Sequence, residues 1–174
     1  MTAVAELSQA RPLMPVEQAL EQLLALAEAA PIRDTENLPL AEAEGRVLAT
    51  DLVASLDLPP WPNSAMDGYA LRKADWQGQP LPVSQRIFAG HAPQPLQPGT
   101  CARIFTGAPV PKGADCVEMQ ENTEVLEDGR VRFLEALQTE QNIRPQGQET
   151  RKGEQVMSAG TRLGPIELGL AATL

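Results

Sequence analysis

Short apolar runs separated by turns rich in Gly and Pro fill the middle of this 174-residue chain, and they limit which elements can form there. Between residues 52 and 141, the runs typical of strands cover 83–89, 101–106, 115–119, 124–126 and 130–133. The last two runs flank Glu127-Asp128-Gly129, which is a strong signal for a β-hairpin. Several short strands at this spacing predict a compact β-barrel or β-sandwich.

A helix is predicted before this region. Pro15 suits the first turn of a helix, and Pro31 ends it. Between them, apolar residues recur with helical spacing and form one stripe: Val16, Leu20, Leu23, Leu24 and Ala27. Such a stripe is typical of packing in a core or a dimer. A shorter helical piece, interrupted by Gly45, is expected around residues 40–49.

The residue pattern of the sequence changes again after residue 141. Residues 142–148 are polar, 154–157 form a short strand candidate, and Gly164-Pro165 opens a second helix. The chain stops at Leu174 inside an apolar stretch, without a Gly, Asn or basic residue to finish that helix. A natural terminus is more often polar, so we expect the sequence to be a piece of a longer protein.

The predicted fold class is therefore β-rich α+β. A β module covering 52–141 is inserted between two terminal segments, 1–51 and 142–174, which we expect to pair with each other. Residues 1–14 are predicted to form a loose arm.

Charge and composition exclude several functions. The chain carries 14 basic and 23 acidic side chains, a net charge of −9, which would repel the phosphates of DNA or RNA. No apolar run approaches the roughly 20 residues that cross a bilayer, and no signal peptide is predicted. Cys101 and Cys116 are too few for a disulfide framework. They fit small buried apolar residues in a reducing cytoplasm better than a metal or redox role.

The common catalytic motifs do not occur. The sequence has no phosphate-binding loop, no dinucleotide-binding fingerprint and no nucleophile elbow. His91 is the only histidine, which argues against a zinc site and against a Ser–His pair. We expect His91 to be an ordinary loop or strand-end residue.

Three segments remain as candidate sites. The first is 63–70, in which Asn63, Ser64 and Asp67 present an amide, a hydroxyl and a carboxylate after the proline-stiffened segment 58–62. Asp67 could hold a hard cation such as Mg²⁺. The alternative is structural, because Asp-Gly is a frequent turn and Asn-Ser often caps local backbone.

The other two segments are 106–111 and 142–152. Thr106 offers a hydroxyl at the end of a strand, and Gly107 lets the backbone approach a ligand closely, although the same pattern is common in plain turns. Arg144 could clamp a phosphate or another oxyanion with two hydrogen bonds. Solvated surface charge is the alternative for this segment.

Taken together and in order, these segments resemble the molybdopterin molybdenumtransferases of the MoeA type, to which the gephyrin E domain is similar. The resemblance covers the chain from about Pro15 to its end. It rests on the following motifs: Leu-Asp-Leu-Pro-Pro-Trp-Pro-Asn-Ser-Ala-Met-Asp-Gly-Tyr-Ala-Leu-Arg at 56–72, Arg-Ile-Phe-Thr-Gly-Ala-Pro-Val-Pro-Lys-Gly-Ala-Asp at 103–115, Gln-Asn-Ile-Arg-Pro at 141–145, and Gly-Pro-Ile-Glu-Leu-Gly-Leu-Ala-Ala-Thr at 164–173.

The resemblance implies a role in the final step of molybdenum cofactor synthesis. Adenylated molybdopterin is hydrolysed and molybdate is inserted at its dithiolene sulfurs, with a divalent cation such as Mg²⁺ assisting. The terminal segments would form an elongated, discontinuous α/β dimerisation domain, and the inserted domain would be barrel-like. A homodimer would build each active site between the inserted domain of one subunit and the molybdopterin-binding domain of the other.

By motif, Asp67 corresponds to the family's functional carboxylate and metal ligand, and Thr106 to its active-site threonine. Asn63, Ser64, Gly107 and Arg144 are the candidate substrate-binding residues beside them. Glu149 stands where the family usually has Asp, and we expect it to bind substrate as well. Asp67 is predicted to be accessible to solvent and to lie beside Thr106.

The motifs of the family's molybdopterin-binding domain are absent, namely Thr-x-Gly-Asp-Glu, Ser-Gly-Gly and Gly-Leu-Pro-Gly-Asn-Pro, and so is its C-terminal β domain. The chain is thus expected to be inactive by itself. Two alternatives remain open. One is a non-catalytic dimerisation or protein-interaction module, and the other is a small β-barrel that binds sugars or peptides, which the low aromatic content of 3% disfavours.

Overall fold

A computed structural model describes residues 13–174, so most of the predicted N-terminal arm lies outside the described residues. The described residues divide into two units, one that ends at Leu38 and one that covers 39–174. In the first, helix α1 (Val16–Ala29) follows Pro15 as predicted. None of its residues is buried, and Leu20, Leu23 and Leu24 are each more than half exposed.

The second unit is built around a four-stranded sheet with the order β4-β5-β3-β6. Its strands are β3 (Gly68–Leu71), β4 (Val83–Ile87), β5 (Cys101–Ile104) and β6 (Cys116–Met119). Strands β4 and β5 run parallel, whereas β3 pairs antiparallel with both β5 and β6. The hairpin predicted from Glu127-Asp128-Gly129 forms β7 (Thr123–Val125) and β8 (Val131–Phe133). The sheet is open, with β4 and β6 at its edges, and no closed barrel is found among residues 13–174, so the predicted barrel-like form of this domain is not confirmed.

Alternating side chains of the central strands enter two separate cores, because successive residues of a strand point to opposite faces. Tyr69 and Leu71 belong to one core cluster and Ala70 to the other. Cys101 and Cys116 are fully buried in the first cluster as free thiols, which confirms their prediction as small buried residues. With apolar packing on both faces, β3 is buried along its whole length. It therefore fixes the position of Asp67, the residue directly before it.

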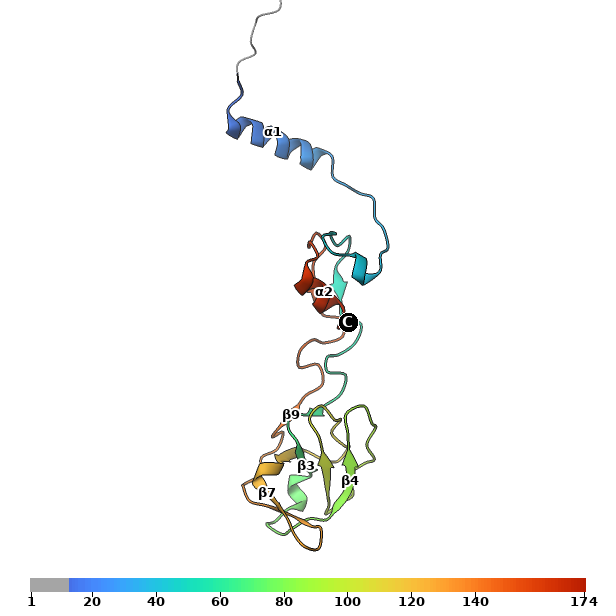
Figure 1. The fold of residues 1–174 in the computed structure, drawn as a ribbon, viewed down its shortest axis with the longest axis vertical. Helices are drawn as coiled ribbons and strands as arrows, with labels where there is room; N and C mark the ends of the chain where they lie inside the picture. The colour runs from blue at the N-terminus through green and yellow to red at the C-terminus, as the bar shows by residue number, and fades with distance from the viewer. Residues whose placement is uncertain (1–12) are drawn as a thin grey trace, which may run out of the picture. The chain divides into compact units, whose positions relative to one another are not determined.

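Outside this sheet, the segments 47–64 and 143–162 pair antiparallel and form a two-stranded ribbon. β1 (Leu52–Val53) pairs with β10 (Gln155–Met157), and β2 (Asn63–Ser64) pairs with β9 (Ile143–Arg144). Isolated bridges join Val47 to Arg162 and Leu58 to Thr150. Figure 1 shows the two segments side by side above β9. The domain boundaries at 51 and 141 stay a prediction.

A small third cluster closes the far end of this ribbon. Ala43, Met157 and Leu163 are buried there, and α2 (Pro165–Ala171) packs beside the 3₁₀ turn η1 (Leu40–Glu42). Two further 3₁₀ turns are η2 (Lys73–Asp75) and η3 (Gln120–Asn122). None of the helices within residues 13–174 has the length and hydropathy to span a membrane.

The prediction of a helical piece at 40–49 is wrong beyond the three residues of η1. Gly45 adopts a φ of +78°, which a right-handed helix does not allow. The backbone N–H of Gly45 then donates to Leu163 O, and that of Leu48 donates to Thr161 O. Pairing with the 161–163 segment therefore replaces the local hydrogen bonds of a helix.

Candidate functional site

Two of the predicted site residues meet at one end of the central strands β3 and β5. Asp67 directly precedes β3, and Thr106 follows β5 by two residues, while Gly68 and Ile104 are register partners of these strands. The backbone N–H and the hydroxyl of Thr106 both donate to Asp67 Oδ1, at 2.8 and 2.7 Å. Asp67 is half-buried and Thr106 is exposed. The predicted position of Asp67, accessible and beside Thr106, is confirmed.

These hydrogen bonds tune the carboxyl group of Asp67. The bonds from the Thr106 backbone and hydroxyl lower the pKa of Asp67 below its ordinary value of 3.8, and the nearby positive charge of Arg103 lowers it further. Asp67 is therefore ionised at neutral pH. Its second oxygen, Oδ2, accepts no hydrogen bond from any residue between 13 and 174, so one carboxylate oxygen is available to a cation or a substrate.

Arg103 links this end of the strands together. Its guanidinium donates to Gly68 O at 2.9 Å and to Gln120 Oε1 at 2.6 Å, and it lies 4.5 Å from the centroid of the Phe105 ring. The backbone N–H of Gln120 in turn donates to Asp67 O at 2.9 Å. Arg103 was not among the predicted site residues, because a single Arg inside a strand looks like ordinary surface charge.

Ser64 and Gly107 hold the two site segments against each other. The Gly107 N–H donates to Ser64 O, and the Ser64 N–H donates to Ala108 O, each at 2.9 Å. Ser64 is fully buried, and its hydroxyl donates to Met66 O at 2.6 Å. This geometry favours the structural alternative for Ser64. Gly107 has a φ of +79°, which favours glycine, and it faces open space apart from Ala89 Cβ at 4.0 Å.

Asn63, Arg144 and Glu149 lie on the paired ribbon. Asn63 is the register partner of Arg144, and its buried Oδ1 accepts no hydrogen bond from the residues that the structure describes. Arg144 is exposed and forms no ion pair within residues 13–174. Glu149 is exposed, and its backbone N–H donates to Leu58 O. Across the described residues, no hydrogen bond or ion pair joins the Glu149 side chain to Asp67 or Thr106, and its role in binding substrate stays a prediction.

The donor set allows a partial metal site only. Among residues 13–174, no three His, Cys, Asp or Glu side chains gather closely enough to hold a metal ion. Mg²⁺ is commonly bound by one or two carboxylates, with waters and substrate phosphates as the remaining ligands. The free oxygen of Asp67 fits that mode of binding, in which the protein supplies a single ligand.

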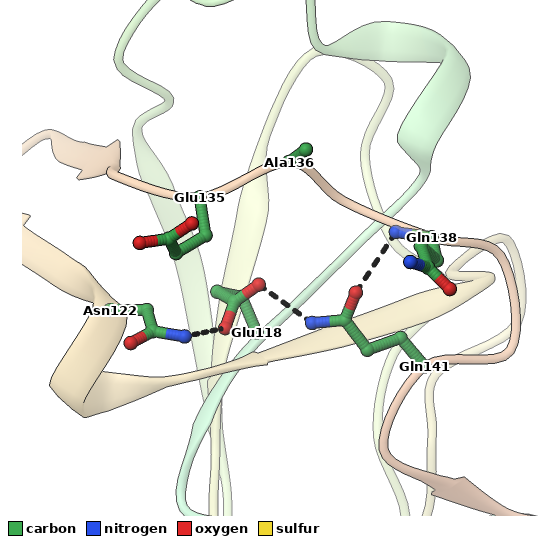
Figure 2. A pocket seen from close by; sticks show the side chains of 6 residues that line it. All are labelled: Glu118, Asn122, Glu135, Ala136, Gln138 and Gln141. Carbon is green, nitrogen blue, oxygen red and sulfur yellow. Dashed lines mark hydrogen bonds between the residues drawn. The ribbon is translucent and has the colours of Figure 1, made fainter.

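A polar pocket lies next to η3, which contributes Asn122 to it. The pocket is lined by Glu118, Asn122, Glu135, Ala136, Gln138 and Gln141. Figure 2 shows the side-chain amides of Asn122 and Gln141 approaching the buried Glu118 carboxylate from opposite sides. The donor-to-oxygen distances are 2.9 and 2.7 Å, and the Met119 N–H also donates to Glu118 at 3.0 Å. A buried carboxylate with these donors ties η3 and residue 141 to β6. It thereby supports Gln120, the residue of η3 that contacts both Asp67 and Arg103. Glu118 was not predicted as a special residue.

Comparisons with known proteins show the family of the chain. The family described as MoeA N-terminal region (domain I and II) matches residues 14–174. A molybdopterin molybdenumtransferase of Haemophilus influenzae is 43% identical over 80% of this chain and 35% of its own length. Gephyrin of Dictyostelium discoideum is 31% identical over 92% of this chain and 24% of its own length.

A solved structure is also similar. The crystal structure of the molybdopterin biosynthesis MoeA protein from Pyrococcus horikoshii superimposes with a TM-score of 0.81 at 37% identity, over 93% of this chain and 44% of that one. The chain spans between about a quarter and two fifths of the length of the curated relatives it matches. Since the family match covers all but the first 13 residues, the chain belongs to the MoeA N-terminal region family.

Proposed function

We propose that this chain is the N-terminal part of a molybdopterin molybdenumtransferase, which inserts molybdate into adenylated molybdopterin during molybdenum cofactor biosynthesis. The observation that carries the proposal is the Asp67 carboxylate, which Thr106 holds by one oxygen while the other accepts no hydrogen bond from the described part of the chain. An ionised, accessible carboxylate at the start of β3 suits the binding of a cation that accompanies an anionic substrate.

The residues have distinct roles under this proposal. Asp67 is the catalytic carboxylate and the ligand for Mg²⁺, which, when bound, supplies positive charge beside the substrate phosphates. Thr106 fixes the orientation of the carboxylate through its two hydrogen bonds. Arg103 anchors the start of β3, and Arg144, which has no ion-pair partner within residues 13–174, offers its charge to an oxyanion. Asn63, Gly107 and Glu149 complete the candidate substrate-binding set, with Ser64 as a buried support.

The net charge of the chain indicates that it does not bind this substrate by itself. Adenylated molybdopterin and molybdate are both anions, and a chain of net charge −9 offers them little attraction. Most of the positive charge of the active site is therefore supplied by a molybdopterin-binding domain outside this sequence. We infer that the 174-residue chain by itself does not catalyse the insertion.

We further propose a homodimer in which the terminal segments, 1–51 and 142–174, form an elongated domain and residues 52–141 form the inserted domain. The exposed stripe on α1 supports this proposal, because Leu20, Leu23 and Leu24 leave 55%, 64% and 57% of their surface uncovered. The buried free thiols Cys101 and Cys116 fit a cytoplasmic enzyme, since cytoplasmic thiols are kept reduced.

The same stripe favours one alternative, a non-catalytic module that only dimerises or binds another protein. The two functions are separable in a chimera that carries this chain in place of the matching region of the Haemophilus influenzae relative. The assay is molybdate insertion into adenylated molybdopterin, followed by activation of a molybdenum-free enzyme. Asp67→Asn keeps the size of the side chain and is expected to lower insertion by about 100-fold or more, as for loss of a preorganised charged group.

Asp128→Asn is the matched control. Asp128 also accepts a backbone and a side-chain hydrogen bond, both from Arg130, but it lies in the β7–β8 hairpin. We expect full insertion activity in that variant. Insertion by Asp67→Asn at the wild-type rate, combined with loss of a partner interaction, would establish the non-catalytic module instead.

A further inference from the structure

The parallel pairing of β4 and β5 brings two aromatic residues together beside the Asp67 site. The strands end at Ile87 and Ile104, which are register partners, so Phe88 and Phe105 leave the sheet side by side at the carboxyl ends of these strands. The Phe105 N–H donates to Ile87 O at 3.2 Å. The two rings stack with centroids 4.8 Å apart and an angle of 8° between their planes.

The stack continues through Arg103. Its guanidinium carbon lies 4.5 Å from the Phe105 centroid, so Phe105 contacts a cation as well as the Phe88 ring. Phe105 is half-buried, whereas Phe88 leaves 48% of its surface exposed and belongs to none of the three core clusters. The His91 ring lies 6.2 Å from the Phe88 centroid, with an angle of 67° between the two ring planes.

The Phe88–Phe105 stack is connected to the Asp67 site through the chain at Phe105. Thr106, which holds Asp67, directly follows Phe105. The surroundings leave room, because a Cβ added at Gly90 would meet nothing within 4 Å and one at Gly107 would meet only Ala89 Cβ at 4.0 Å. Phe88 is therefore a half-exposed aromatic ring whose orientation is fixed by stacking on Phe105, and such a ring can stack with a ligand.

We propose that Phe88, supported by Phe105 and Arg103, is a binding surface for a planar fused-ring heterocycle of the substrate. This inference rests on the proposed function, since adenylated molybdopterin contains two such rings, adenine and the pterin. Stacking places that ring against Phe88 while the phosphates lie toward Asp67. Because Phe105 already holds the Phe88 ring in place, binding loses little free energy to ordering that side chain.

The test uses the 174-residue chain and two uncharged probes, adenosine and unsubstituted pterin, with ribose as the control without an aromatic ring. Ligand-observed NMR measures saturable binding and the upfield shift that an aromatic face imposes on the ring protons of a stacked probe. Phe88→Leu keeps an apolar side chain without an aromatic face, and we expect it to weaken binding by roughly tenfold and to abolish the upfield shift. Phe88→Tyr restores an aromatic face and is expected to bind like the wild type.

The outcomes separate the two rings. Binding of adenosine assigns the surface to the nucleotide end of the substrate, and binding of pterin assigns it to the other end. The inference is overturned if neither probe binds saturably with an upfield shift, or if Phe88→Leu binds the probe as well as wild type.

A second pair of measurements separates failure of this inference from failure of the proposed function. In the chimera, Phe88→Leu is expected to raise KM for adenylated molybdopterin about tenfold with kcat retained. Asp67→Asn is expected to leave binding of the uncharged probes unchanged while insertion falls. Full insertion by Asp67→Asn with intact, Phe88-dependent stacking would refute the role of Asp67 and leave the stacking surface in place.

Discussion

Replacing Gly68 by Ala tests how the sheet holds the Asp67 site. A Cβ at this position would lie 1.9 Å from Glu118 O, 2.8 Å from Glu118 C and 3.0 Å from Met119 Cα. Real Cβ atoms essentially never come within 3.0 Å of such atoms, so β6 has to retreat from β3 by more than about 1 Å. Backbone atoms of a paired strand have no rotamer to escape into, and the φ of Gly68 is not in the region that favours glycine, so the effect is purely steric.

The magnitude follows from two contributions. Overpacking in a well-ordered core costs about 1–3 kcal/mol, and each backbone hydrogen bond lost at the β3–β6 end costs about 1 kcal/mol. We expect Gly68→Ala to lower the free energy of unfolding by about 3 kcal/mol, which corresponds to a fall in Tm of roughly 6–12 °C for a chain of this size. The site moves with the strand, because Arg103 donates to Gly68 O and Asp67 directly precedes it.

The assay is urea unfolding followed by circular dichroism, with Gly169→Ala as the matched control. Gly169 lies inside α2, and a Cβ there would meet nothing within 4 Å. The same substitution is therefore expected to stabilise the chain by about 0.5–1 kcal/mol, through the higher helix propensity of Ala. A loss below about 0.5 kcal/mol for Gly68→Ala would refute the steric reasoning, since such a value is typical of an unconstrained surface position.

The hydrogen bonds and the burial of side chains give four more predictions. Thr106→Val removes one of the two bonds that lower the pKa of Asp67, so a ¹³C NMR titration should show that pKa rising part of the way toward 3.8, whereas Thr106→Ser should leave it unchanged. Because the folded pKa of Asp67 is depressed, its contribution to stability is present above pH 3.8 and is lost as the pH falls through the folded pKa. Acid unfolding of Thr106→Val at the same pH as wild type would contradict this. Burial raises the pKa of Cys101 and of Cys116 to about 12, so iodoacetamide at pH 8 should alkylate neither thiol in the folded chain and both after unfolding, as measured by mass spectrometry. Glu118→Gln replaces an acceptor of three hydrogen bonds with an amide and should cost about 1–2 kcal/mol in urea unfolding; an unchanged midpoint would show that these bonds do not support the turn.

Local sequence signals determined much of this molecule. Pro15 and the helical spacing of apolar residues define α1, and the Glu127-Asp128-Gly129 turn defines the β7–β8 hairpin, because each depends on residues close together in the chain. The motif around Asp67 identified the candidate carboxylate for the same reason. The burial of Cys101 and Cys116 follows from their apolar character within strands.

Only the tertiary structure decided which distant segments meet. Asp67 and Thr106 are 39 residues apart, and their contact exists because β3 and β5 pair in one register. The sheet ends at β4 and β6 where the sequence favoured a barrel or a sandwich, and the parallel pairing of β4 with β5 places Phe88 against Phe105. No local pattern encodes such pairings, because the free energy that selects a register comes from side chains on both strands and the two cores, which assemble only when the whole chain folds.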